Sequence, residues 1–287
     1  MTIYLTLQED NKHFKGHLRK FTVVLIGSII VSVSLVILSN PESRKAVDII
    51  VLDITGAIAL TLGLIVIYRH KFHGPYGKPF FLLSMGVFFW LAADITISYY
   101  YFILLIKDVP PPVSFADALW LVGYVFFALH LFMMLKIVRK KINIAVVIVT
   151  SVASIIFVTY TIAAHAPLIS SEFAHQHYLV FVVNISYPVA DAILIIPAVS
   201  VLVAHRTDYE HSIPMTLASL SLLINALADY GFVNDVLNNN TENKWIWDLF
   251  FISDFLIIAA ALYWYNRYYV TREIAGRQGS ENPSNNI

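Results

Sequence analysis

The chain has 287 residues, of which 58% are hydrophobic and 13% charged, whereas an average soluble domain carries about 45–50% apolar and about 25% charged residues. Nineteen basic and nineteen acidic side chains give a formal net charge of zero, which excludes a nucleic-acid-binding protein that depends on a basic excess. The sequence has no cysteine, so disulfides, thiolate metal ligands and cysteine nucleophiles are excluded. This composition indicates an integral membrane protein, whose first expected partner is the lipid bilayer.

Eight stretches are long and apolar enough to cross the hydrocarbon core as helices, which takes about 20 residues. Polar or Pro/Gly-rich segments separate them. In chain order they are 21–39, 47–68, 79–106, 114–135, 143–164, 178–204, 213–236 and 246–266. The sequence thus predicts an all-α, polytopic membrane protein with eight transmembrane helices. Residues 1–20 precede them as a cytoplasmic segment, and we expect 271–287 to form a disordered cytoplasmic tail.

The distribution of lysine and arginine predicts the orientation, because cytoplasmic loops of membrane proteins are enriched in these residues. With the N-terminus inside, fifteen of the nineteen basic residues fall in cytoplasmic segments. The other four lie in outer segments and are Arg44, Lys45, Lys107 and Lys244. We therefore expect a cell-membrane protein with both termini in the cytoplasm.

Aspartates recur in matching order in the two halves of the chain. Asp53, Asp94 and Asp117 of the second, third and fourth spans correspond to Asp191, Asp229 and Asp248 of the sixth, seventh and eighth, at offsets of 131 to 138 positions. Such internal similarity predicts two four-helix repeats, 21–137 and 138–270. Because four is even, both repeats enter the membrane in the same sense, as parallel repeats do.

Ionisable residues inside a bilayer are costly and by default suggest function. No lysine or arginine falls inside the predicted spans, so the intramembrane aspartates must be protonated, hydrogen-bond to polar side chains, line a wet cavity or hold a cation. The predicted topology places all of them between the midplane and the outer face. The candidate ligand-binding residues are Asp94, Asp191, Asp229, Asn184, Tyr187, Asn225, Asp117, Asp248, Asp254 and Asp53.

A structural role competes with this interpretation for Asp117 and Asp248. Both open a predicted span, where a carboxylate can cap free N–H groups and meet the positive end of the helix dipole. The segment from Ser114 to Asp117 has the spacing of a capping box. Asp94, Asp191 and Asp229 have no helix start nearby and are the stronger functional candidates.

The histidines give a weaker signal for a metal site. His165, His175 and His177 fall in the predicted outer loop between the fifth and sixth spans, where solvated side chains are the simpler interpretation. His130, in the fourth span, is expected to be a packed polar residue. Common hydrolase and nucleotide-binding motifs are missing, so we expect no enzyme. The sequence leaves metal binding open and identifies neither a cofactor nor the small ligand or cation.

The paired segments WLAAD and VSFADALWLVGY in the first half, and YPVAD, ALADYGF and WIWDLFFISDF in the second, resemble the N-terminal membrane region of bacterial diguanylate cyclase and phosphodiesterase (GGDEF/EAL) proteins. This resemblance spans about residues 80–265 and implies a sensor of an unidentified signal. Only a short polar segment follows the last span, so we expect no GGDEF or EAL output domain here.

Three functions follow as hypotheses. The first is a sensor or receptor-like protein that binds a small ligand or cation in an outward-facing acidic pocket and signals to a separate cytoplasmic partner. The second is a secondary transporter of a cation or proton-coupled solute, which repeats and midplane aspartates favour. The third is an intramembrane metal-dependent hydrolase.

Overall fold

A computed structural model describes residues 2–70, 72, 74–106, 113–165, 174–204, 209–237 and 245–267. The described part of the chain is built of eight long helices and one short 3₁₀ turn, in the order α1 Thr2–Ile37, α2 Pro41–His70, α3 Gly74–Phe102, α4 Phe115–Val138, η1 Arg139–Lys141, α5 Ile144–His165, α6 Ala174–Ala204, α7 Tyr209–Leu237 and α8 Trp245–Tyr265. Each of these eight helices is long and apolar enough to cross a membrane. The protein is therefore an all-α, multi-pass membrane protein, as predicted.

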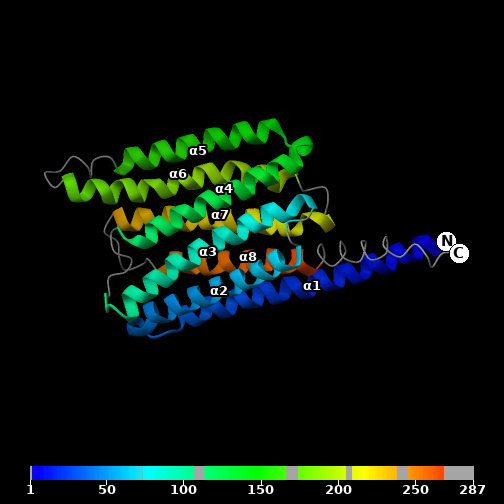
Figure 1. Cartoon of the computed structure of the whole chain (residues 1–287), viewed down its shortest axis with the longest axis horizontal. Helices are drawn as coiled ribbons and strands as arrows, with labels where there is room; N and C mark the ends of the chain where they lie inside the picture. The colour runs from blue at the N-terminus through cyan, green and yellow to red at the C-terminus, as the bar shows by residue number, and fades with distance from the viewer. Residues whose placement is uncertain are drawn as a thin grey trace.

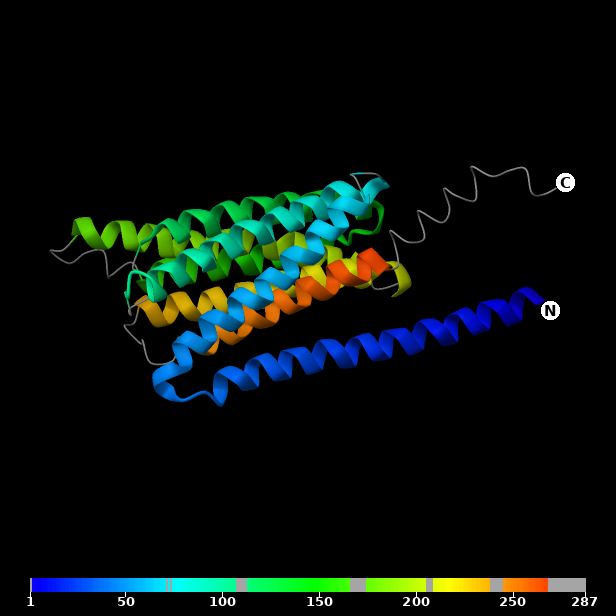
Figure 2. The same ribbon diagram turned by 60° about the horizontal axis from the view of Figure 1, so that its bottom comes forward.

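Several helices begin or end away from the predicted bounds. Helix α1 starts at Thr2, so the segment expected before the first span is helical and extends past the other helices (Figure 2). Helix α3 ends at Phe102 instead of continuing to residue 106. There Leu105 adopts a φ of 56°, a left-handed conformation that closes helices. The expected tail, 271–287, lies outside the described residues.

At three helix starts, polar side chains accept hydrogen bonds from backbone N–H groups that have no partner inside the helix. Asn40 precedes Pro41, and its Oδ1 accepts the N–H of Glu42 at 3.3 Å. Asn143 accepts the N–H of Ala145 at 3.0 Å. Asp117 accepts the backbone N–H of Ser114 at 2.7 Å, which confirms its predicted capping role at α4.

The helices run alternately up and down along a common axis, so the start of α1 and the end of α8 lie at the same end of the bundle (Figure 1). We call this the terminal end. The connections α1–α2, α3–α4, α5–α6 and α7–α8 lie at the other end, which we call the distal end. An even number of crossings requires this arrangement.

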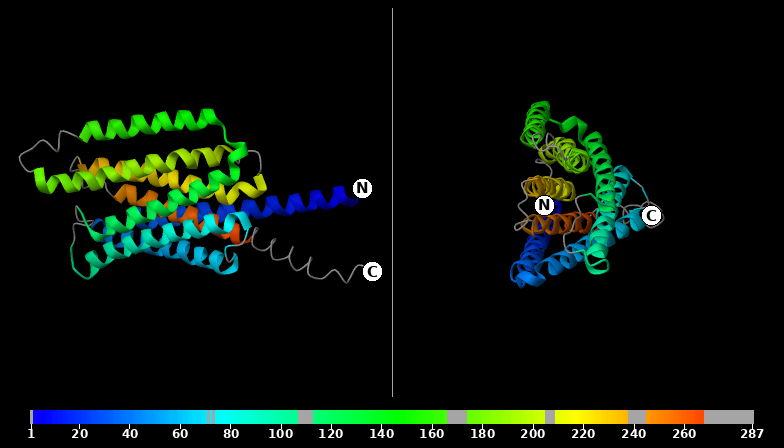
Figure 3. Two further views of the ribbon diagram at one scale, coloured as in Figure 1. Left: turned by 45° about the horizontal axis from the view of Figure 1, so that its top comes forward. Right: turned by 90° about the vertical axis from the view of Figure 1, so that its left-hand side faces the viewer.

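Helix packing follows a closed order in which α2, α3, α4, α6, α7 and α8 each contact the next and α8 returns to α2. Helix α1 packs on α2 and α8, and α5 packs chiefly on α6. These two helices lie at opposite edges of the bundle (Figure 3) and expose most of their apolar side chains, Ile148, Val149 and Ile155 of α5 among them. Lipid is the natural neighbour of such surfaces.

The contacts within the first half recur in the second. The pairs α1–α2, α2–α3 and α3–α4 match α5–α6, α6–α7 and α7–α8. Between the halves, α2–α8 matches α6–α4. Exchange of two parallel repeats about an axis along the bundle would produce these recurring pairs, although the α1–α8 contact has no α5–α4 counterpart of similar size, and the division into 21–137 and 138–270 stays a prediction. We call the α2–α8 and α4–α6 contacts the first and second seams.

The interior differs between the two ends. The terminal half is filled by fully buried apolar side chains of six helices, including Phe80, Phe127, Leu131, Met215 and Leu262. Most aspartates of the interior lie toward the distal half, because they occur late in α3 and α7 and early in α2, α4 and α8, while Asp191 and Asp254 lie near the middle of α6 and α8. The terminal half is thus closed by packing, and the carboxyl groups lie between the middle of the bundle and its distal end.

Candidate functional site

The second seam carries a hydrogen-bonded network that joins the two halves. The Tyr124 hydroxyl, from α4, contacts Asp191 Oδ1 of α6 at 2.7 Å and Asp229 Oδ2 of α7. Asn225, one turn before Asp229, donates from Nδ2 to the Tyr124 oxygen at 3.0 Å and to Asp229 Oδ2 at 2.8 Å. One phenol of the first half therefore holds two carboxyl groups of the second, and the predicted site residues Asp191, Asp229 and Asn225 are brought together.

A second contact crosses the same seam closer to the distal end. The Tyr187 hydroxyl of α6 donates to Asp117 Oδ1 at 2.7 Å, while Asp117 Oδ2 accepts from Ser114. Asp117 therefore caps its own helix with one oxygen and joins the halves with the other. The capping and functional interpretations of this residue are compatible.

Aromatic rings surround these carboxyl groups. The ring centroids of Tyr124 and Tyr187 lie 6.2 Å apart. The Trp90 ring centroid lies 5.5 Å from that of Tyr124, and the Trp120 ring centroid lies 6.5 Å from that of Tyr187. Trp120 donates from Nε1 to Asp94 Oδ1 at 3.1 Å, and Trp90 donates to the Trp120 carbonyl at 3.2 Å. Carboxylates beside aromatic faces are the chemistry with which proteins recognise cations.

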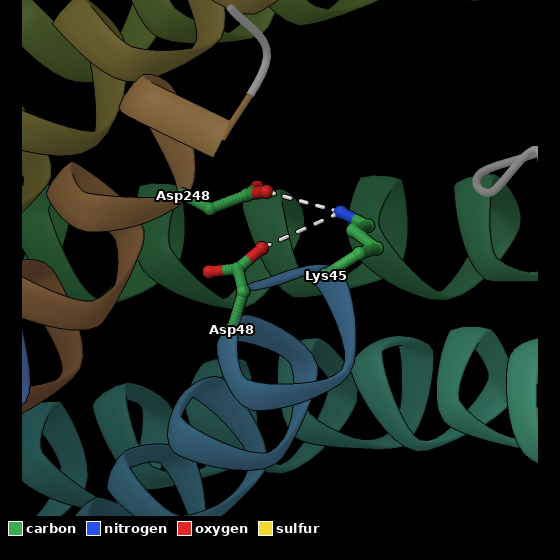
Figure 4. Close-up of polar contacts among 3 residues, drawn as sticks. All are labelled: Lys45, Asp48 and Asp248. Atoms are coloured by element: carbon green, nitrogen blue, oxygen red, sulfur yellow. Dashed lines mark hydrogen bonds and ion pairs between the residues drawn. The ribbon is translucent and has the colours of Figure 1, made fainter. Parts of the chain in front are cut away.

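The first seam is ionic. Lys45, in the first turns of α2, lies 3.1 Å from Asp248 of α8 and 3.5 Å from Asp48 of its own helix (Figure 4). The expectation that no lysine or arginine pairs with the aspartates is wrong for Asp248. The sequence predicts Lys45 in an outer loop. Because α2 begins at Pro41, the lysine is instead helical and faces α8. Beside it, Arg44 lies 4.7 Å from the Trp245 ring centroid.

The remaining candidates have separate partners. Asp53 accepts from Ser98 of α3, and Asp254 accepts from Ser221 of α7. Asn184 donates to the Val180 carbonyl of its own helix at 2.9 Å, so no contact joins it to the second-seam network. Asn184 lies three and seven positions before Tyr187 and Asp191, so it shares a helix face with them without sharing a hydrogen bond.

Some residues of the site were not among the sequence candidates. Lys45 was missed because its helix was expected to begin at residue 47, and Asp48 was missed although it lies inside the predicted span, because it has no counterpart in the aspartate pattern of the two halves. Tyr124 and Trp120 lie on one face with Asp117, at spacings of seven and three positions, and this spacing is the signal that could have included them. Asp235, which accepts from Trp247 Nε1 at 2.7 Å, had no such signal.

No group of three or more histidine, cysteine, aspartate or glutamate side chains suited to a metal ion occurs among the described residues. His130 is 1% exposed and its Nδ1 lies 2.8 Å from the Pro79 carbonyl oxygen, which confirms a packed polar residue. His165 ends α5, and His175 and His177 lie in the first turns of α6, so the backbone there is helical where a loop was expected. Their side chains lie outside the described part.

The carboxyl groups also lie close enough to interact with one another. Asp94 has Asp53 and Asp254 within electrostatic range, and Asp254 lies near Asp229. The side chains of Asp254 and Asp191 are almost completely buried, each residue being 1% exposed. Such a cluster, bounded by aromatic rings and closed at the terminal end, can bind protons or a small cation.

No protein-family model, curated protein or solved structure matches this chain.

Proposed function

We propose that this protein is a membrane sensor that binds a small cationic ligand in the acidic network of the distal half and transmits occupancy through the second seam. The observation that carries this proposal is the contact of Tyr124 with Asp191 and Asp229, because one hydroxyl group joins the two halves at the carboxyl groups themselves. Any cation that takes the place of the phenol as their partner must alter how α4 meets α6 and α7.

The closed terminal half supports a sensor over a carrier. A carrier must open its site to both sides of the membrane in turn, and the apolar layer around Phe127 and Leu131 obstructs the terminal side. A sensor needs only a shift of helices that a partner can detect. The basic residues near the terminal end and the resemblance to membrane regions of GGDEF/EAL proteins support a cytoplasmic signalling partner there.

The orientation is part of the same proposal. Fifteen of nineteen basic residues belong to the N-terminal segment, the connections at the terminal end and the C-terminal segment, which favours a cytoplasmic terminal end. The acidic network would then be reached from outside the cell.

Ligand binding can be tested with the purified full-length protein in lipid nanodiscs. The probes are Na⁺, a primary ammonium ion and a quaternary ammonium ion, each followed by the shift in melting temperature. We expect at least one probe to stabilise the wild type and to lose this effect in D191N and in D229N. The variant E42Q, which changes an exposed carboxylate at the start of α2, should behave as wild type. Equal shifts in all four proteins would refute the proposed site.

Transmission can be tested by spin labelling, because the chain has no native cysteine. Labels at K136C of α4 and V203C of α6 report the distance between the halves near the terminal end. A stabilising probe should change this distance in the wild-type background and leave it unchanged when D191N is added. An unchanged distance in both would contradict a sensor.

A secondary carrier is the second candidate, favoured by the recurring contacts of the two halves. Proteoliposomes containing the protein should then show probe flux driven by a gradient. Flux that requires Asp191 would favour the carrier, and its absence in the presence of binding would favour the sensor.

A further inference from the structure

The contacts of the Tyr124 hydroxyl group can be compared with the number of hydrogen atoms available to form them. Its hydroxyl oxygen contacts two carboxyl oxygens, Asp191 Oδ1 and Asp229 Oδ2. A phenol carries one proton, and an ionised carboxylate is only an acceptor. Two such contacts need two hydrogen atoms, and Tyr124 supplies one. If both aspartates were ionised, one contact would place two oxygen atoms against each other without a hydrogen between them.

Asn225 cannot supply the missing hydrogen. Its side-chain nitrogen has two hydrogen atoms, and it donates one to the Tyr124 oxygen and one to Asp229 Oδ2. Cations do not compensate either. The ion pairs formed by the described residues join Lys45 to Asp48 and Asp248, at the other seam. The second hydrogen atom must therefore sit on Asp191 or Asp229.

The surroundings of Asp191 favour the same conclusion. Asp191 is 1% exposed and its second oxygen, Oδ2, has no hydrogen-bond partner within the described part of the chain. An unpartnered buried oxygen is far more costly on an ion than on a neutral acid. The titratable groups that face the pair are Tyr124 and Asp117 from α4, Tyr187 from α6 and Asp254 from α8, and none of them brings a positive charge.

We propose that Asp191, Tyr124 and Asp229 form a proton-binding site in which the two carboxyl groups share a single proton through the phenol. The hydrogen ion thus occupies the site until the cationic ligand of the proposed function displaces it. When the proton is present, both contacts of Tyr124 are hydrogen bonds and hold α4 to α6 and α7. When it leaves, two anions face one phenol and the second seam loosens. This proposal rests on the proposed function, whose ligand site it specifies.

Infrared difference spectroscopy of the full-length protein in nanodiscs at neutral pH tests the shared proton. A protonated carboxyl group has a carbonyl-stretch band that shifts when the sample is transferred to D₂O. Spectra of the wild type minus D191N, and of the wild type minus D229N, isolate the bands that belong to the pair. The control D235N changes a buried aspartate whose partner is the Trp247 N–H.

A shared proton predicts that D191N and D229N each remove the same single band, equal in area to one carboxylic acid per chain, because the remaining aspartate can then ionise and accept from Tyr124. Removal of a different band by each variant would show two independent acids and overturn the sharing. No band loss in either variant would overturn the site. D235N should leave the pair's band unchanged.

Y124F provides a second route if either asparagine variant fails to fold. It keeps both carboxyl groups and removes the bridge, so the band should move in frequency, and an unmoved band would overturn the role of the phenol. Failure of this proposal is distinct from failure of the proposed function. A probe-induced melting shift without the shared band would support the sensor and contradict the shared proton. The shared band without any melting shift would support the shared proton and contradict the sensor.

Discussion

Lys45 and Asp248 lie 3.1 Å apart although 203 positions separate them in the sequence. The pair joins the first turns of α2 and α8 at the distal end and carries the only salt bridges that the described residues form. At the first seam this ion pair lies where the Tyr187–Asp117 hydrogen bond lies at the second seam. Asp248 and Asp117 are also the positions that the predicted repeat pairs with each other.

Replacement of Lys45 by methionine should destabilise the protein. The change leaves Asp48 and Asp248, both under 8% exposed, facing each other without a cation. A hydrogen bond to a charged group contributes about 1.5 to 3 kcal/mol, and the one-third exposure of the Lys45 side chain places the loss near the lower value. Thermal unfolding in nanodiscs measures it. K136M, at an exposed lysine of α4, is the control and should be neutral, and a triple variant K45M/D48N/D248N should regain part of the loss.

The contact between Tyr187 and Asp117 should show energetic coupling. Removal of the hydroxyl in Y187F costs one buried hydrogen bond, about 1 kcal/mol. A double-mutant cycle of Y187F with D117N, followed by unfolding, should give a coupling energy of about 1 kcal/mol. Y160F changes an exposed tyrosine of α5 and should be silent. Strictly additive effects of Y187F and D117N would mean that the hydrogen bond does not join the halves.

Two glycines allow tryptophan rings to approach a neighbouring helix. A methyl group on Gly123 would overlap the Trp90 ring, and one on Gly231 would overlap the Trp247 ring, whereas Gly27 has open space around it. We expect G123A and G231A to cost about 1 to 3 kcal/mol each through overpacking. G27A should be neutral or slightly stabilising, because alanine favours a helix by about 1 kcal/mol over glycine. Melting temperatures that rank the three variants otherwise would contradict the packing described.

The proposed orientation gives a labelling prediction, since a chain without native cysteine carries only the cysteine that is introduced. In intact cells a membrane-impermeant maleimide should label E42C at the distal end and should not reach K140C in η1 until the membrane is permeabilised. The reverse pattern would place the termini outside and move the acidic network to the cytoplasmic half.

The helices and part of the chemistry can be predicted from the amino-acid sequence. Long apolar runs predict the eight spans because a bilayer leaves the backbone no other partner than its own helix. Ser114 and Asp117 predict the start of α4, because capping depends on neighbours within one turn. The order of Asp53, Asp94 and Asp117 against Asp191, Asp229 and Asp248 predicts an internal repeat. All of these depend on residues close together in the chain or on their spacing.

Which side chains meet follows from the packing of the helices and is not visible in the sequence. Tyr124 contacts Asp191 and Asp229, at separations of 67 and 105 positions, and Lys45 meets Asp248 because α2 packs on α8. Such pairs depend on which helices are neighbours and on the rotation of each about its axis, and the apolar all-round composition of these spans leaves that rotation undefined in the sequence. The pairing matters energetically because these side chains are buried: a carboxyl group in the membrane interior needs a hydrogen-bond partner, a cation or a proton.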